Sequence, residues 1–265
     1  NVTITTNTVT LYTDTNMTID GLSLNNNSTH VMDIHIIATE KSGPSGNGII
    51  LKITNTEAKS TKFSIFGVTA DLLECNLTNV SIVCLNGCHF SAKKCRLHNF
   101  IFTSGPSYLK IRNTEATNTI FSIVGGAIDL SFCNFTNVSI ACRNGCHFSA
   151  NNCRFHNSVF VIIQTLMIEA NFNWCTFYGG YTHISLWESK ATFSDSKFTE
   201  TEKPLHINQS ITIIHKCSFS NNKILAAETI ATIDNNPSVG YIIHNTGGSL
   251  HISESLFKVS YTIHT

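Results

Sequence analysis

The chain has 265 residues, and its 17 lysine and arginine residues balance 17 aspartate and glutamate residues, so its formal net charge is zero. Only 13% of the residues are charged, which excludes the basic surface that nucleic acids and anionic lipids require. No apolar run approaches the roughly 20 residues of a membrane-spanning helix, whereas 42% hydrophobic residues can fill a core. We therefore expect a folded protein with no nucleic-acid partner and no membrane insertion.

Residues 1–48 contain short alternations of apolar and polar residues, such as Val9-x-Leu11. A period of two is typical of β-strands. We expect this segment to form N-terminal coils or a cap. The sequence KSGPSGNG at 41–48 is rich in turn residues, and we interpret it as the loop that precedes the main domain at 49–265.

Residues 55–102 and 113–160 are a duplication without gaps, because 31 of their 48 aligned positions are identical at an offset of 58. A shorter period lies within it. A frame of apolar-x-apolar-x-x-(Cys/Thr/Ser)-x-(Phe/Leu/Ala) recurs every 19–22 residues along most of the chain. Its last position is held by Ala58, Leu77, Leu97, Ala116, Phe135, Phe155, Phe177, Phe198, Phe219 and Phe257. We interpret the Phe members of this series as an inward stack.

Coils of about 20 residues, with short alternating strands between Gly and Asn turns, indicate a parallel β-solenoid whose coils bury their inner faces against each other. No stretch has the 3.6-residue period of a helix. The prediction is an all-β, single-domain, right-handed parallel β-helix. Asn recurs two positions after the apolar anchor, where a ladder of side-chain amides would accommodate tight turns. The predicted Asn ladder comprises Asn79, Asn99, Asn118, Asn137, Asn157 and Asn221.

With this frame and its Asn corner, the sequence resembles the pectate-lyase-like, right-handed parallel β-helix over roughly residues 50–265. More narrowly, it is similar to the polymorphic membrane protein type of repeat, which combines GG(A/L/I) with FxxN. The sequence GGAI at 125–128 approaches the first motif, and FSAN at 148–151 and FSNN at 219–222 match the second. Members of that family are surface adhesins, so the resemblance implies an adhesive role.

Ten cysteines contrast with the low charge of the chain. Six of them, which include Cys175 and Cys217, occupy one inward phase of the frame. Adjacent coils lie about 4.8 Å apart, within the range that a disulfide bridges. Bridges across coils and across one corner are therefore predicted, with buried reduced thiols or a zinc site with neighbouring His residues as the alternatives. The candidate pairs are Cys75 with Cys95, Cys133 with Cys153, Cys84 with Cys88, and Cys142 with Cys146.

Cysteine-rich composition and many Asn-x-Ser/Thr sequons favour a secreted or cell-surface location. Asn76 and Asn134 lie between two inward residues, so their side chains should face solvent and carry glycans. Asn16 and Asn208 are further candidates. Asn79 and Asn137 belong to the predicted ladder and should stay unmodified.

The acidic residues are scattered singly, and no Ser/His/Asp spacing or paired carboxylates stand out. The sequence therefore predicts no catalytic residues, no metal site, no cofactor and no enzymatic activity. The alternative is a polysaccharide lyase or hydrolase on the same scaffold, for which Asp71 and Glu74 would be the residues to test.

The leading hypothesis is an extracellular structural or adhesive solenoid that stacks end to end into a filament, on copies of itself or on further coils of a longer chain. Its other expected partners are a cell-surface protein or a glycan. A viral or phage fibre segment is a second alternative. The exposed residues expected to form a binding face are Trp174, Tyr178, Tyr181 and Trp187.

Overall fold

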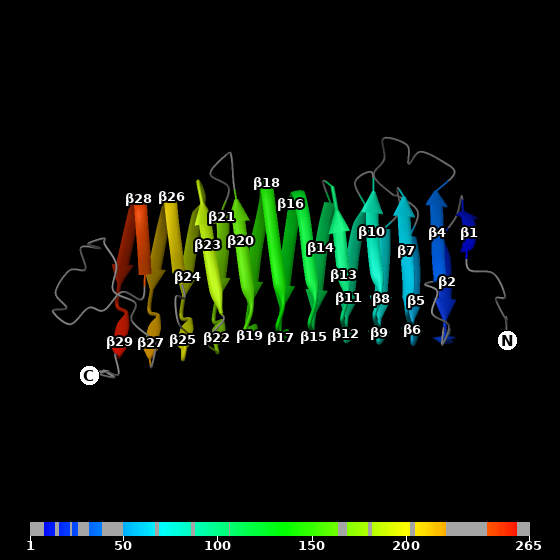
Figure 1. Cartoon of the computed structure of the whole chain (residues 1–265), viewed down its shortest axis with the longest axis horizontal. Coiled ribbons are helices and arrows are strands. Elements are labelled where there is room, and N and C mark those ends of the chain that lie inside the picture. The colour runs from blue at the N-terminus through cyan, green and yellow to red at the C-terminus, as the bar shows by residue number, and fades with distance from the viewer. Residues whose placement is uncertain are drawn as a thin grey trace, which may run out of the picture.

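The structure is a computed structural model, and it describes residues 8–13, 16–21, 23–25, 32–38, 50–66, 69–85, 88–105, 107–163, 169–179, 182–201, 205–220 and 243–258. Within these ranges the chain forms 29 strands and no helix. The strands pair in parallel in two sheets, one of 18 strands and one of 11. Figure 1 shows them side by side along one axis. The prediction of an all-β, right-handed parallel β-helix is confirmed.

Each coil has three sides, which we call the first, second and third face. The first face contains β2 (Met17–Asp20), β5 (Ile50–Thr54), β8 (Thr69–Leu73), β11 (His89–Lys93), β14 (Ser107–Arg112), β21 (Glu169–Asn173) and β24 (Lys190–Ser194). The second face contains β3 (Ser23–Asn25), β6 (Glu57–Lys59), β9 (Asn76–Thr78), β12 (Arg96–His98), β15 (Glu115–Thr117), β17 (Asn134–Thr136), β19 (Arg154–His156), β22 (Thr176–Tyr178), β25 (Lys197–Thr199), β27 (Ser218–Ser220) and β29 (Leu256–Lys258).

The third face contains β1 (Thr8–Thr13), β4 (Met32–Ala38), β7 (Thr61–Phe66), β10 (Ser81–Leu85), β13 (Ile101–Ser104), β20 (Val159–Ile163) and β23 (His183–Trp187). Four longer strands run from the third face onto the first, and they are β16 (Ile120–Ser131), β18 (Ser139–Asn151), β26 (Leu205–His215) and β28 (Ile243–Ser253). The third and first faces therefore belong to one sheet. The described strands of residues 1–48 are part of the same stack, since β1 pairs with β4, β2 with β5, and β3 with β6.

The chain turns between faces through residues with positive φ. The first corner, between the first and second faces, has such residues at Asn55, Glu74, Lys94, Asn113, Phe132, Asn152, Trp174, Asp195, Lys216 and Glu254. The second corner, between the second and third faces, has them at Ser60, Asn79, Asn99, Asn118, Asn137, Asn157 and Glu200. Asn tolerates this left-handed conformation better than most side chains, which explains its recurrence there.

The predicted Asn ladder lies at the second corner. The Asn99 side-chain amide donates a hydrogen bond to Asn79 Oδ1 at 2.9 Å, and the Asn137 amide donates one to Asn118 Oδ1 at 3.1 Å. Amides on adjacent coils are therefore linked along the axis. Asn221 lies outside the described residues.

The core is a column of aromatic rings inside the coils. Along the second face, the ring of Phe177 stacks on those of Phe155 and Phe198, with centroid separations of 5.2 and 4.6 Å, and Phe219 continues the stack at 4.5 Å from Phe198. Phe135 lies at its other end. The predicted inward stack is confirmed for these five residues, each of which has no exposed surface. No helix among the described residues is long and apolar enough to span a membrane.

Candidate functional site

Outward side chains of β8, β11 and β14 surround a shallow hollow of about 510 Å³ on the first face. Parallel register places Asp71, Ser91 and Lys110 side by side on successive coils. Their neighbours along the strands complete the lining of the hollow, which includes Thr69, His89, Lys93, Tyr108 and Arg112. Acidic, basic, imidazole and phenol groups that are distant in sequence are thus gathered on one surface.

Tyr108 is half-buried in this hollow, and its hydroxyl lies 3.3 Å from Oδ2 of Asp129 on the next coil. Burial of the phenol raises the pKa of Tyr108, and the negative charge of Asp129 raises it further, while Arg112 opposes the effect. Tyr108 therefore stays protonated at neutral pH and donates its hydrogen bond to the carboxylate.

Arg112 also faces Asp129, with 3.9 Å between its guanidinium and Oδ2. Its side chain is 49% exposed, so most of its donors remain available to a ligand. The ring of His89 lies with its centroid 5.8 Å from that of Tyr108. The site therefore combines an imidazole that can act as a general base, a protonated phenol and a half-exposed guanidinium.

The duplication contains a counterpart of this surface with different chemistry. His147 of β18 occupies the place of His89, but the next coil contributes Glu169, Asn171 and Asn173 where the first copy has Tyr108, Lys110 and Arg112. These three residues of β14 lie between the duplicated units. Only the first copy therefore has the phenol and the cations beside its histidine.

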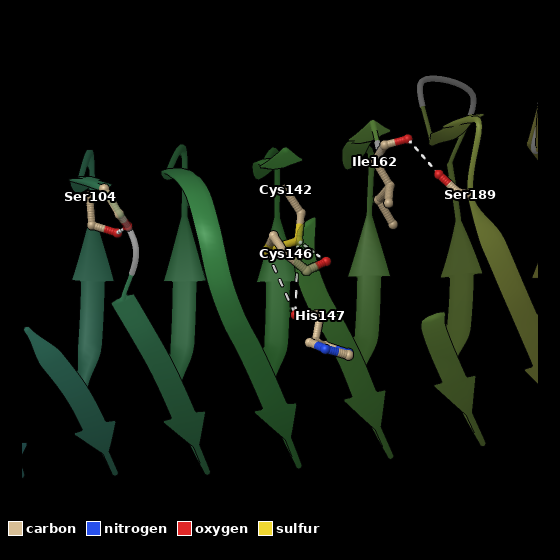
Figure 2. Close-up of a disulfide and its surroundings, with 7 residues drawn as sticks. Ser104, Cys142, Cys146, His147, Ile162 and Ser189 are labelled. Carbon is tan, nitrogen blue, oxygen red and sulfur yellow. Dashed lines mark hydrogen bonds between the residues drawn. A yellow bond between two sulfur atoms is a disulfide. The ribbon is translucent and has the colours of Figure 1, made fainter. Parts of the chain in front are cut away.

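Two disulfides lie at the third corner, between the third and first faces. They join Cys84 to Cys88 and Cys142 to Cys146, with Cα separations of 5.9 and 5.5 Å. Figure 2 shows the second bond immediately before His147. The first occupies the same position before His89, so it constrains the turn that leads into the hollow.

The predicted bridges across coils are not made. Cys75, Cys95, Cys133 and Cys153 are buried free thiols, as are Cys175 and Cys217. Each of these six sulfurs is a hydrogen-bonded thiol that donates to the carbonyl two residues earlier, for example Cys133 to Ser131 at 3.2 Å. Other coils use a hydroxyl for the same bond at this position, as Thr114 does to Arg112 at 2.9 Å. The cysteines therefore substitute for Thr and Ser at the first corner.

Three of the four aromatic residues expected to form one binding face lie on different sides of the coil. Trp174 lies at the first corner and is 58% exposed, while Trp187 lies on the third face and is 41% exposed. Tyr178 lies on the second face, where its ring stacks on His156 at 4.6 Å. Tyr181 lies outside the described residues. Residues that are close in sequence can lie on different faces, because a coil turns a corner within a few residues.

The sequon residues lie in different surroundings. Asn76 and Asn134 are both exposed at the start of second-face strands. Asn16 is also exposed, but its Oδ1 accepts a hydrogen bond from the Ile50 amide at 2.9 Å. Asn208 lies in β26, and its side chain is outside the described set. Glycosylation itself stays a prediction.

No protein-family model matches the chain, and no curated protein matches its sequence. Solved structures do match its fold. A double mutant of the periplasmic alginate epimerase AlgG aligns with 97% of this chain and 77% of its own, at 11% identity and a TM-score of 0.57. The structure of AlgG without these mutations aligns over the same shares of both chains, with a TM-score of 0.48. A GH87 alpha-1,3-glucanase from Streptomyces thermodiastaticus aligns with 95% of this chain and 60% of its own, at 8% identity and a TM-score of 0.28.

The expectation that the chain is not an enzyme is contradicted by the match to the AlgG double mutant, since an epimerase has the same fold. At 11% identity the likeness to AlgG shows the fold alone. The physical reason for the error is that a search for paired carboxylates tests for hydrolysis only. Register across coils brings together His89, Tyr108 and Arg112, which no local motif reveals. The polymorphic membrane protein type of repeat is not shown.

Proposed function

We propose that the protein modifies an acidic polysaccharide of the uronate class by moving the proton next to the sugar carboxylate, in the hollow formed by β8, β11 and β14. One observation carries this proposal. His89, the protonated Tyr108 and the half-exposed Arg112 line a single surface hollow, and each has a role in that reaction.

Removal of a proton beside a carboxylate shifts negative charge onto the carboxylate oxygens, and a fixed cation stabilises that charge. Arg112 can hold a carboxylate through two parallel N–H donors, and Lys110 adds a second positive charge. His89 accepts the proton, because imidazole is the side chain that most often serves as a general base. Tyr108 supplies a proton to the opposite face of the same carbon, which yields the epimerised sugar. Exchange with water then takes the proton from His89 and returns one to Tyr108, so the pair is reset.

The fold supports a polysaccharide substrate, since the alginate epimerase with the same architecture acts on such a polymer. An open sheet face also suits a long chain better than a deep pocket does. The two disulfides support an oxidising compartment, so we place the protein in the periplasm or outside the cell. An adhesive role, end-to-end stacking and a cell-surface protein partner remain hypotheses without support from the site.

The experiment is incubation of the protein with polymannuronate in D2O, followed by NMR. Deuterium should appear at the carbon next to the carboxylate, in a polymer that keeps its length. His89→Gln should lower the exchange rate about 100-fold or more, the usual contribution of a general base. Arg112→Gln should lower it by a similar factor, because the developing charge would lose its partner.

His147→Gln is the matched control, since the same substitution is made in the duplicate surface that lacks the phenol and the cations. It should retain the wild-type exchange rate. Equal rates in wild type and His89→Gln would overturn the assignment of the site. Shortened polymer with unsaturated ends would mean that the same proton abstraction leads to elimination.

A further inference from the structure

Two large aromatic side chains project from the first corner on coils that follow β14. Phe132 is 62% exposed and Trp174 is 58% exposed. Asn152 occupies the corner of the coil between them, as the hydrogen bonds from Phe132 N to Asn151 O and from Asn152 N to Asn173 O establish. Two strand spacings separate the aromatic residues, about 10 Å. That separation is close to the length of two sugar units in an extended polymer.

The backbone at both positions is unfavourable for an aromatic residue. Phe132 has φ of 55° and Trp174 has φ of 52°, in the left-handed region where a bulky side chain is a genuine outlier. Neighbouring coils place Asn113 and Asn152 at this corner, with the same sign of φ. Since both rings are mostly exposed, packing in the core does not account for the choice of Phe and Trp.

A hollow of about 470 Å³ lies between the two rings, and its polar lining includes Asn134, Asn152 and Arg154. Arg154 is exposed and forms no ion pair with any residue that the structure describes. Its duplicate, Arg96, lies 3.8 Å from Glu115. In the register of the second face, the neighbours of Arg154 are Asn134 and Thr176. The second copy therefore offers a guanidinium without a carboxylate beside it.

The corner is continuous with the proposed active site. Phe132 also lines an adjacent hollow of about 400 Å³ that contains Lys93, Arg112 and Asp129. Lys93 and Arg112 in turn line the hollow around His89. A chain in contact with all three hollows would pass from the imidazole, across the guanidinium of Arg112, to the aromatic corner.

We propose that Phe132, Trp174 and Arg154 form a secondary subsite that binds two uronate units of the polysaccharide, remote from the unit that reacts. The apolar faces of the sugar rings stack on the aromatic rings, the amides of Asn134 and Asn152 bond hydroxyl groups, and Arg154 binds a carboxylate. The identity of the polymer rests on the proposed function. The position of the subsite rests on the exposed aromatic pair and the unpaired arginine.

The experiment uses the intrinsic fluorescence of the protein. The chain has two tryptophans, so a Trp187→Phe background leaves Trp174 as the reporter. Oligomannuronates of two to six units are titrated into this background, and the fluorescence of Trp174 should change with saturation. Phe132→Asn and Arg154→Gln in the same background should each raise the dissociation constant at least fivefold. Arg96→Gln is the matched control and should leave it unchanged.

Trp174→Asn is followed by calorimetry and by deuterium exchange. Asn already occupies this corner in other coils, so the variant should fold normally. It should raise KM for the long polymer and leave kcat unchanged, whereas His89→Gln lowers kcat with affinity retained. Oligomannuronate affinity equal in wild type, Phe132→Asn and Trp174→Asn would overturn the subsite alone. Absence of binding by wild type to any oligomannuronate would overturn both the subsite and the proposed substrate.

Discussion

The hydroxyl of Tyr108 and the carboxylate of Asp129 face each other at 3.3 Å across two adjacent coils. Asp129 pairs in register with Lys110, two residues along the strand from Tyr108. The contact is therefore diagonal, and it depends on the alignment of β14 with β16. This pair keeps a proton on the phenol beside the half-exposed guanidinium of Arg112.

We expect Asp129→Asn to lower the pKa of Tyr108, because the substitution removes a negative charge that disfavours the tyrosinate. The pKa should stay above the ordinary value of 10.0, since burial is the largest cause of the shift. NMR titration of protein with labelled tyrosine, with Tyr108→Phe to assign the resonance, measures this change. A Tyr108 pKa unaltered in Asp129→Asn would contradict the role of the carboxylate.

The same shift predicts how stability depends on pH. The folded state holds the Tyr108 proton more tightly than the unfolded state, so this contribution to stability is complete below pH 10. It is lost as the pH rises from there through the folded-state pKa. Urea unfolding between pH 8 and pH 11 should show a smaller loss of stability in Tyr108→Phe than in wild type.

The thiols of the first corner should act as hydrogen-bond donors. We expect Cys75→Ala to lower the free energy of unfolding by about 1 kcal/mol, because the carbonyl of Leu73 would lose the bond it accepts from the thiol at 3.4 Å and keep only the one from the Asn55 amide. Cys75→Thr should lower the free energy of unfolding by less, since Thr56 makes the equivalent bond to the carbonyl of Thr54 at 3.0 Å on the preceding coil. Urea unfolding of both variants measures the difference.

A count of reactive thiols tests the same assignment independently. The protein purified without reductant and unfolded in guanidinium should expose six thiols, as the two corner disulfides protect the other four cysteines. Four thiols or fewer would mean that bridges form across coils, and the hydrogen-bonded assignment of the thiols would then be wrong.

Gly126 should be indispensable to the alignment of β14 with β16. Its φ is 90°, and a Cβ atom there would overlap the backbone oxygen of Ser107 on β14. We expect Gly126→Ala to lower the free energy of unfolding by about 3 kcal/mol. Gly105→Ala is the control, because a Cβ at that glycine meets nothing within 4 Å. Similar melting temperatures for the two variants would contradict the close approach.

The fold could be predicted from the sequence because every coil of the solenoid has the same structural requirements. Each coil must place an apolar residue inward and a tolerant residue at each corner, so Phe177 and Asn118 reveal their places by phase alone. Phase also predicts the inward position of six cysteines and the two disulfides at the corners, whereas the predicted bridges between Cys75 and Cys95 and between Cys133 and Cys153 are wrong. The phase of the repeat predicts where a cysteine lies. It does not predict which carbonyl a thiol such as that of Cys133 contacts, because that depends on the geometry of the turn.

The candidate site could not be predicted in the same way. Tyr108, Lys110 and Arg112 lie between the duplicated units and carry no repeat signature, and their relation to His89 arises from register between coils. Phe132 did leave a signal, since it replaces Glu74 of the first copy. A comparison of the two copies that asked which exposed positions differ would have found it.

Glycosylation gives the last prediction, because it links the corner geometry to the proposed subsite. In a glycosylating host, Asn76 and Asn134 should be modified, since both are exposed at the start of second-face strands. Asn137 should not be modified, because its amide nitrogen donates to Asn118 at 3.1 Å. Glycopeptide mass spectrometry measures the occupancy of each sequon.

Asn134 also lines the hollow between Phe132 and Trp174, so a glycan there would cover the proposed subsite. Protein from the glycosylating host should bind oligomannuronate at least fivefold more weakly than protein without glycans. Thr136→Ala removes the sequon but keeps Asn134 and should restore the affinity, whereas Thr78→Ala, the same change in the duplicate without an aromatic corner, should not. Full affinity with Asn134 occupied would place the polymer elsewhere on the coil, because a sugar chain and a glycan cannot fill the same hollow.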